Sequence, residues 1–98
     1  MSVYFIVEIK TKNDNQAAYA KYIEKVRPIV ERYKGRYLSR GGKIVPVFGG
    51  WKPERIIIIK FPFARDVERW LSSPEYKEIA VLRENSTVTK AIMIEGCT

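Results

Sequence analysis

The sequence predicts an α+β fold in which one four-stranded antiparallel sheet carries helices on one of its faces. Two observations predict it. Strand-like stretches cover residues 3–9, 36–40, 55–61 and 87–95, and helical periodicity fills the first and third of the intervals between them. A chain in the order β-α-β-β-α-β pairs its strands antiparallel and leaves both helical connections on one side of the sheet.

The third strand, residues 55–61, gives the strongest evidence. It contains four consecutive isoleucines, Ile56 to Ile59, and isoleucine is a β-branched residue that favours strands. Successive side chains of a strand point to opposite faces, so this run places apolar side chains on both faces. A sheet with one face in water alternates apolar and polar residues instead. We therefore expect both faces of this sheet to be buried.

The first strand and the turn after it begin the chain. Residues 3–9 are apolar on both faces until Glu8. Residues 10–15 form a polar turn that ends in side chains suited to capping a helix N-terminus, namely Asn13, Asp14 and Asn15.

The first helix follows, with apolar residues repeating at spacings of three and four. Pro28 falls inside this pattern, so we expect a kink there or a second helical segment that starts near Arg27. Gly35 is the expected residue just beyond the helix C-terminus.

Turn residues are concentrated between the second and third strands. The pairs Gly41-Gly42 and Gly49-Gly50 predict positive φ angles, in bulges or tight turns. Pro46 lacks an amide hydrogen, so residues 43–48 form an edge or bulged piece of sheet at best.

Two helices and a strand complete the chain. A short helix is expected over residues 64–71 and another over residues 74–84, the latter starting with Ser73 as N-cap and Pro74 in the first turn. Residues 87–95 form the last strand. The whole chain, residues 1–98, is expected to be a single domain with the ferredoxin-like arrangement.

The apolar second face of this sheet needs a cover. The helices cover one face only, and an exposed apolar face of this size exceeds the ~300–600 Å² patch typical of a monomer. The simplest cover is the same face of a second copy, in a two-fold homodimer.

Composition excludes several classes of site. The chain has no histidine, which removes the commonest general base and metal ligand, and we expect neither a metal site nor a cofactor. Cys97 is the single cysteine, which fits a cytoplasmic protein with a free thiol. The apolar runs are too short for a membrane span. Twelve isoleucines and a single glutamine suggest a heat-adapted source.

Positive charge is concentrated in residues 34–63, which hold seven lysines and arginines and one acid, Glu54. Any anion is expected to bind there first. Arg36 and Arg40 are candidate ligand-binding residues on one strand, expected on the same face and ~13 Å apart at 3.3 Å per residue. The alternative is that they pair with carboxylates, such as those of Glu8 and Glu95.

Four other residues are ligand-binding candidates, each with a structural alternative: Trp51, Tyr37, Tyr76 and Arg83. Trp51 either stacks on a ligand or plugs the edge of the barrel or dimer. The tyrosines either place a hydroxyl in a cavity or belong to the core or the interface. Arg83 lies on the inner side of its predicted helix, where it contacts a ligand or forms a buried ion pair.

Several short motifs in a fixed order resemble the family named domain of unknown function 1330: Gly35-Arg36-Tyr37, Arg40-Gly41-Gly42, Gly50-Trp51-Lys52-Pro53-Glu54-Arg55, Phe61-Pro62 and Ser72-Ser73-Pro74-Glu75-Tyr76. The resemblance spans nearly the whole chain and implies a dimeric α+β barrel. That superfamily includes muconolactone isomerases, quinone-forming monooxygenases, haem-degrading enzymes and ligand-sensing domains. The resemblance implies no particular activity for the family itself.

Three functional hypotheses follow. The first is a homodimer that binds a small anionic or aromatic metabolite, either without catalysis or as a cofactor-free isomerase or monooxygenase-like enzyme. The second is a structural or interaction role in which dimerisation is the function. The third is nucleic-acid binding, which the pI of 9.7 invites. Isoleucines stand where RNA-recognition modules carry stacking aromatics, so the third hypothesis is disfavoured.

Overall fold

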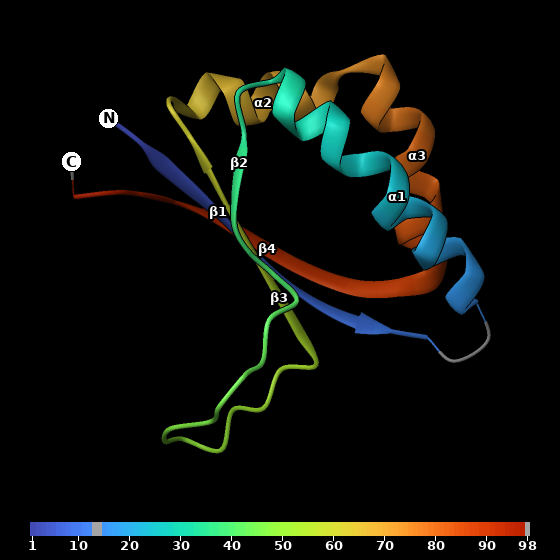
Figure 1. The fold of residues 1–98 in the computed structure, drawn as a ribbon, viewed down its shortest axis with the longest axis vertical. Helices are drawn as coiled ribbons and strands as arrows, with labels where there is room; N and C mark the ends of the chain where they lie inside the picture. Colours follow the sequence, from blue (N-terminus) through green and yellow to red (C-terminus); the bar gives the residue numbers. More distant parts are fainter. Residues whose placement is uncertain (13–14, 98) are drawn as a thin grey trace.

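The computed structural model describes residues 1–12 and 15–97 (Figure 1). The predicted order of strands and helices is confirmed, with the second helical connection divided into two helices at Ser73. The elements are β1 (Val3–Thr11), α1 (Gln16–Arg32), β2 (Arg36–Arg40), β3 (Arg55–Phe61), α2 (Ala64–Ser72), α3 (Pro74–Ser86) and β4 (Thr87–Glu95).

The four strands form one antiparallel sheet in the order β2-β3-β1-β4. Figure 1 shows all three helices on the same side of it. The two most apolar strands, β1 and β3, take the central positions, where both edges of each strand are hydrogen-bonded. The expected fold, an α+β ferredoxin-like sheet with helices on one face, is confirmed.

The hydrophobic core lies between the inner face of the sheet and the helices. Alternate residues of the central strands are buried there, and burying each such aliphatic side chain stabilises the fold by ~1.5–3 kcal/mol. The buried apolar residues of the strands are Val3, Val7, Ile9, Ile57, Ile59 and Phe61. Those of the helices include Tyr19, Tyr22, Val26, Ile29, Val30, Val67, Trp70, Tyr76 and Ile79.

Strand β2 contains an irregularity that changes which face its arginines occupy. The register with β3 shifts at Leu38. Arg36 pairs with Lys60, which lies in the outward-facing row of β3, whereas Arg40 pairs with the buried Ile57. The expectation that both arginines point to the same face is therefore wrong, because one extra residue inverts the alternation of side chains.

Helix α1 is one continuous helix that contains Pro28. The proline removes one amide donor, but the residues after it, Ile29 and Val30, are buried in the core and keep the segment helical. A separate segment starting near Arg27 is not formed.

The ends of α1 differ in detail from the expected caps. Asn13 and Asp14 lie outside the described residues, and Asn15 makes no side-chain cap bond but donates its amide to the Asn85 carbonyl at 3.4 Å. At the other end Lys34, with φ of 73°, takes the left-handed position expected for Gly35. Gly35 is needed for another reason, because a Cβ there would lie 2.9 Å from the Phe61 ring.

Residues 41–54 form an arm that extends away from the body of the domain (Figure 1). The prediction of positive φ is confirmed at Gly41, Gly49 and Gly50, with values of 73°, 85° and 69°. Residues 43–48 form no strand, so the edge piece considered for them is not present.

The outer face of the sheet carries a continuous apolar row. Ile6 pairs with Ile58 on one side and with Ile92 on the other. Ile92 is 59% exposed, and no helix lies on this side of the sheet (Figure 1). Among the described residues, no helix is long and apolar enough to cross a membrane.

Candidate ligand-binding cavity

A cavity of about 390 Å³ lies between the inner face of the sheet and helices α1 and α3. Its volume falls within the ~300–1,000 Å³ of small-molecule sites in proteins. Aliphatic side chains of the central strands, including Val7, Ile57 and Ile59, line it from the sheet. Aromatic side chains line it from the helices: Tyr19, Tyr22, Trp70 and Tyr76.

Three arginines from three different elements line this largely apolar cavity. Arg40 ends β2, Arg55 begins β3 and Arg83 comes from α3. No aspartate or glutamate is among the lining residues that the structure describes. Within residues 1–12 and 15–97, none of the three arginines forms an ion pair. The cavity therefore concentrates positive charge that no carboxylate of the described chain neutralises at close range.

Arg40 is held in place by its neighbours. Its guanidinium donates a hydrogen bond to the carbonyl of Ile23 in α1. It also lies over the ring of Tyr37, with Cζ 4.9 Å from the ring centroid, a cation–π arrangement.

Arg55 and Tyr19 face each other with unused hydrogen-bonding groups. The Cζ atom of Arg55 lies 5.8 Å from the centroid of the Tyr19 ring. The Nε of Arg55 and the hydroxyl of Tyr19 are buried, and neither has a partner among the described residues. Gly41 packs against this guanidinium so closely that a Cβ there would overlap it. Both groups lie at the wall of the cavity, and a ligand would reach them only after these side chains shift, because neither atom is open to water.

A short hydrogen-bonded chain runs through Tyr22, Tyr76 and Arg83. The two tyrosine hydroxyls lie 3.0 Å apart, and the Nε of Arg83 donates to the Tyr76 oxygen at 3.3 Å. Tyr22 and Tyr76 are buried, at 6% and 5% exposure. The chain joins α1 to α3 across the cavity.

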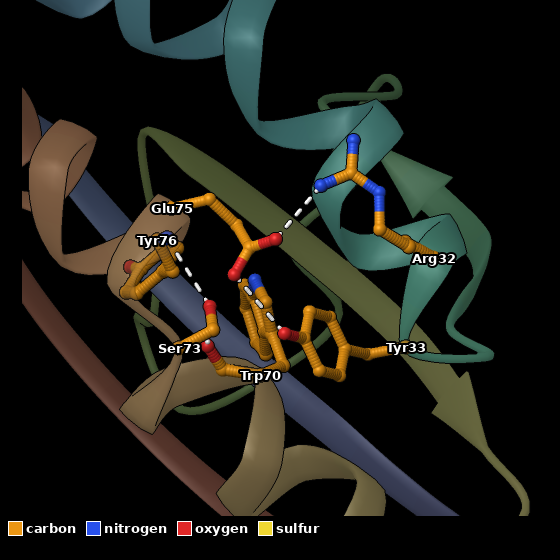
Figure 2. Close-up of polar contacts among 6 residues, drawn as sticks. All are labelled: Arg32, Tyr33, Trp70, Ser73, Glu75 and Tyr76. Carbon is orange, nitrogen blue, oxygen red and sulfur yellow. Dashed lines mark hydrogen bonds and ion pairs between the residues drawn. The ribbon is translucent and has the colours of Figure 1, made fainter.

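Ser73 sets the positions of two aromatic residues of the cavity (Figure 2). As the N-cap of α3 it accepts a hydrogen bond from the Tyr76 amide at 3.2 Å, as the sequence predicted. Its hydroxyl also donates to the Trp70 carbonyl at 2.8 Å. One buried serine therefore fixes both the end of α2 and the start of α3.

Glu75 fastens the start of α3 to the end of α1 (Figure 2). Its carboxylate accepts hydrogen bonds from Arg32 Nη1 at 2.8 Å and from the Tyr33 hydroxyl at 3.1 Å. Hydrogen bonds hold the pKa of this carboxyl below its ordinary value. The largest effect comes from the backbone amide of Glu75 itself and the next from the Tyr33 hydroxyl. These contacts of Glu75 with Arg32 and Tyr33 hold α1 and α3 together beside the cavity.

The ionisable groups of the cavity act as hydrogen-bond donors at neutral pH. Burial raises the pKa of Tyr37 to about 12 and raises the pKa values of Tyr19 and Tyr22 as well. Burial acts to lower the pKa of Arg83, but Tyr76, Tyr22 and Glu84 together outweigh this effect and raise the pKa overall. Tyr19, Tyr22 and Tyr37 are therefore neutral and Arg83 is protonated.

No side chain that lines the cavity can act as a base at neutral pH, because none of the described lining residues is a histidine, lysine or carboxylate. The described part of the chain also has no cluster of three or more potential metal ligands. The site can bind an anion and donate protons in hydrogen bonds.

The family model of the Domain of unknown function (DUF1330) matches residues 2–97, nearly the full length. The chain belongs to the DUF1330 family. The family resemblance inferred from the ordered motifs is confirmed. No curated protein matches the sequence.

Solved structures with the same fold include proteins of different kinds. RPA0582 of Rhodopseudomonas palustris, a protein of unknown function, is 17% identical with a TM-score of 0.81, and the match covers 99% of this chain and 83% of that one. SnoaB of Streptomyces nogalater, a cofactor-independent oxygenase, is 10% identical with a TM-score of 0.71, covering 99% and 94%. A dimeric protein of unknown function from Bacteroides fragilis is 14% identical with a TM-score of 0.68, covering 97% and 96%. At these identities the likeness shows the fold alone.

Four of the six predicted ligand-binding residues of this DUF1330 protein line the cavity: Tyr37, Arg40, Tyr76 and Arg83. The structure brings them together from β2 and α3. Neither of the two arginines among them takes the carboxylate partner that the structural alternative required, at least within residues 1–12 and 15–97. Their role in binding stays a prediction.

The other two predicted residues lie elsewhere. Arg36 is exposed, on the outward row of β2. Trp51 is 63% exposed on the arm, and its indole nitrogen donates to the Glu8 carboxylate at 3.4 Å. Glu8 belongs to the outward row of β1, so Trp51 approaches the outer face of the sheet and is not a wall of the cavity.

Arg55 and Tyr19 line the cavity but were not among the predicted residues. A signal for Arg55 exists in the sequence, because it shares the inward alternation of Ile57, Ile59 and Phe61 along β3. For Tyr19 the signal is weaker, since its place on the buried stripe of α1 is equally consistent with an ordinary core residue.

Proposed function

We propose that this protein is a homodimer that binds a small anionic aromatic metabolite in the cavity of each subunit. The observation that carries the proposal is the set of three arginines, Arg40, Arg55 and Arg83, lining a cavity with no acidic residue among its described lining. Placing cations in an apolar enclosure is unfavourable unless an anion compensates them. Guanidinium groups are also suited to bidentate recognition of carboxylates.

The remaining surface of the cavity suits a flat, apolar ligand body. Tyr19 and Tyr22 stack nearly parallel, with centroids 6.2 Å apart, and Trp70 packs on Tyr76 with centroids 4.8 Å apart. Aromatic walls of this kind offer stacking and edge contacts to an aromatic ring.

The homodimer is proposed to form through the outer face of the sheet. The exposed row centred on Ile6, Ile58 and Ile92 supplies a self-complementary apolar surface. Dimers are also described for the protein of the same fold from Bacteroides fragilis. A second copy would cover the face that the helices leave open.

A binding assay tests the proposal. Native mass spectrometry of freshly purified protein should give a dimer, with extra mass where a ligand is retained. Aromatic carboxylates should then raise the melting temperature, whereas their uncharged amides should not. Arg55→Gln should weaken binding of the acids by about 10- to 100-fold, the range for a hydrogen bond to a charged group. Arg69→Gln, on the exposed face of α2, is the matched control. A bare dimer that no anion stabilises would favour a purely structural role.

A second candidate function is cofactor-independent oxygenation. It is favoured by the shared fold with SnoaB and by a cavity whose charged groups are all cations. A substrate that enters as a phenolate or enolate can itself transfer electrons to dioxygen without a protein base, whereas isomerisation by proton abstraction needs one. Oxygen uptake that matches the loss of a bound hydroxyaromatic acid would support this function. Tight binding without oxygen uptake would reject the oxygenase function and support binding without catalysis.

A further inference from the structure

We propose that the cavity recognises its ligand at two separate poles, and that the ligand is an aromatic carboxylate carrying a hydroxyl or keto oxygen on its ring system. This inference rests on the proposed function and deepens it. The carboxylate is assigned to Arg55 and Tyr19, and the ring oxygen to the chain Tyr22–Tyr76–Arg83.

The first pole follows from two buried donors without partners. The Tyr19 hydroxyl and the Arg55 Nε are buried and unsatisfied within the described residues, and both residues line the cavity. Tyr19 is only 6% exposed. A buried donor without an acceptor is unfavourable by ~1–3 kcal/mol, and a carboxylate oxygen between the two side chains would satisfy both. Trp70 Nε1 is also unsatisfied, but in Figure 2 it points toward the Glu75 side and is assigned to neither pole.

The second pole follows from counting protons. Tyr22 and Tyr76 together have two hydroxyl protons, and the single bond between them uses one. The bond from Arg83 to Tyr76 uses a proton of the guanidinium. One phenolic proton is therefore left over, whichever tyrosine donates to the other. Accepting a bond from a cation also makes the Tyr76 hydroxyl a stronger donor. An oxygen acceptor on the ligand would take the remaining proton.

The Arg55 Nε at the first pole can only donate, whereas the tyrosine hydroxyls at both poles can donate or accept. The hydroxyl of Thr89, which also lines the cavity, is engaged with Thr87 at 2.7 Å. No asparagine, glutamine or carboxylate is among the described lining residues. A ligand with a carboxylate at one end and an oxygen at the other fits this set, whereas the guanidinium groups repel a cation.

The spacing of the poles suits a single aromatic unit between them. Tyr19 and Tyr22 are three residues apart on one face of α1, and their rings lie nearly parallel with centroids 6.2 Å apart. The two poles are therefore assigned to neighbouring side chains of one helix face, close enough for a single ligand to contact both.

The test uses three probes that share one ring: benzoate, 4-hydroxybenzoate and 4-hydroxybenzamide, titrated by ligand-observed NMR. We expect 4-hydroxybenzoate to bind best and the amide to bind at least about 10-fold more weakly. Tyr19→Phe and Arg55→Gln should weaken both acids by the same factor, about 10-fold or more for Arg55→Gln. Removing both hydroxyls, Tyr22→Phe together with Tyr76→Phe, should weaken 4-hydroxybenzoate by about 3- to 10-fold and leave benzoate unchanged, because either tyrosine alone keeps a phenolic proton for the ring oxygen.

A matched control separates binding from folding. Arg69→Gln removes an exposed guanidinium that is not among the residues lining the cavity. It should not alter the order of the three probes. If no probe binds, the proposed function itself is overturned. If the acids bind but the Tyr22→Phe, Tyr76→Phe double variant weakens both equally, or Tyr19→Phe and Arg55→Gln weaken neither, the two-pole assignment is wrong while anion binding stands.

Discussion

Replacing Tyr19 by phenylalanine is predicted to stabilise the protein in the absence of ligand. The Tyr19 hydroxyl is buried and makes no hydrogen bond of good geometry within residues 1–12 and 15–97. An unsatisfied buried polar group is unfavourable by ~1–3 kcal/mol. Burial raises the pKa of Tyr19, but the Arg55 guanidinium beside the hydroxyl acts to lower it and offsets part of this cost, which places the expected gain near the lower end, ~1 kcal/mol.

Tyr22→Phe makes the identical change one turn further along α1 and should act in the opposite direction. Its hydroxyl lies 3.0 Å from that of Tyr76 in a buried hydrogen bond. Losing this bond should destabilise the protein by ~0.5–1.5 kcal/mol. The two variants therefore compare the loss of a hydroxyl that forms a hydrogen bond, in Tyr22, with the loss of one that forms none in the described residues, in Tyr19.

Thermal unfolding followed by circular dichroism measures both effects. For a domain of this size ~1 kcal/mol corresponds to ~4–8 °C, so Tyr19→Phe should melt higher and Tyr22→Phe lower by that amount. Protein concentration must be held constant, because the melting temperature of a dimer depends on it. A lowered melting temperature for both variants would refute the reasoning, since it would mean that the Tyr19 hydroxyl has a stabilising partner.

Three further predictions concern packing, pH and assembly. Gly35→Ala should destabilise the fold by ~1–3 kcal/mol in urea unfolding, because its Cβ would lie 2.9 Å from the Phe61 ring. The lowered pKa of Glu75 contributes stability that is present above the ordinary value of 4.5 and is lost as pH falls through the lowered pKa. Glu75→Gln should therefore flatten the acid side of the stability–pH curve, and an unchanged curve would contradict this. Ile92→Lys should shift sedimentation from dimer to monomer, whereas Val81→Lys, an equally exposed site on α3, should not.

The fold could be predicted from the sequence because its main signals are local. The four isoleucines of β3 require burial on two faces, and the strand takes a central position in the sheet. Ser73 followed by Pro74 marks a helix start that depends only on neighbouring residues, and the structure has it there. Of the two alternatives at Pro28, a second segment near Arg27 is not formed, because burial of the residues after the proline keeps the helix continuous, and a kink stays a prediction.

The face of each arginine could be predicted only where strand alternation is regular. Arg55 shares the inward parity of Ile57 along β3, so its direction follows from the sequence once that parity is used. Arg36 and Arg40 stand on a short strand with few apolar residues, where nothing local indicates the irregularity at Leu38. The shift arises from pairing with β3, so only the assembled sheet separates the two arginines.

The chemistry of the cavity depends on a property that sequence cannot give, which is whether a hydroxyl has a partner. Tyr19 and Tyr22 are the same residue type on the same buried face of one helix. Only Tyr22 meets another hydroxyl, that of Tyr76, which is 54 residues away in the chain and is held by the Ser73 cap. Helix α3 places a hydroxyl beside Tyr22, and no described residue forms a hydrogen bond with the Tyr19 hydroxyl. Two equivalent positions of the sequence therefore take different roles. Tyr22 belongs to the hydrogen-bonded chain, whereas Tyr19 lies beside Arg55.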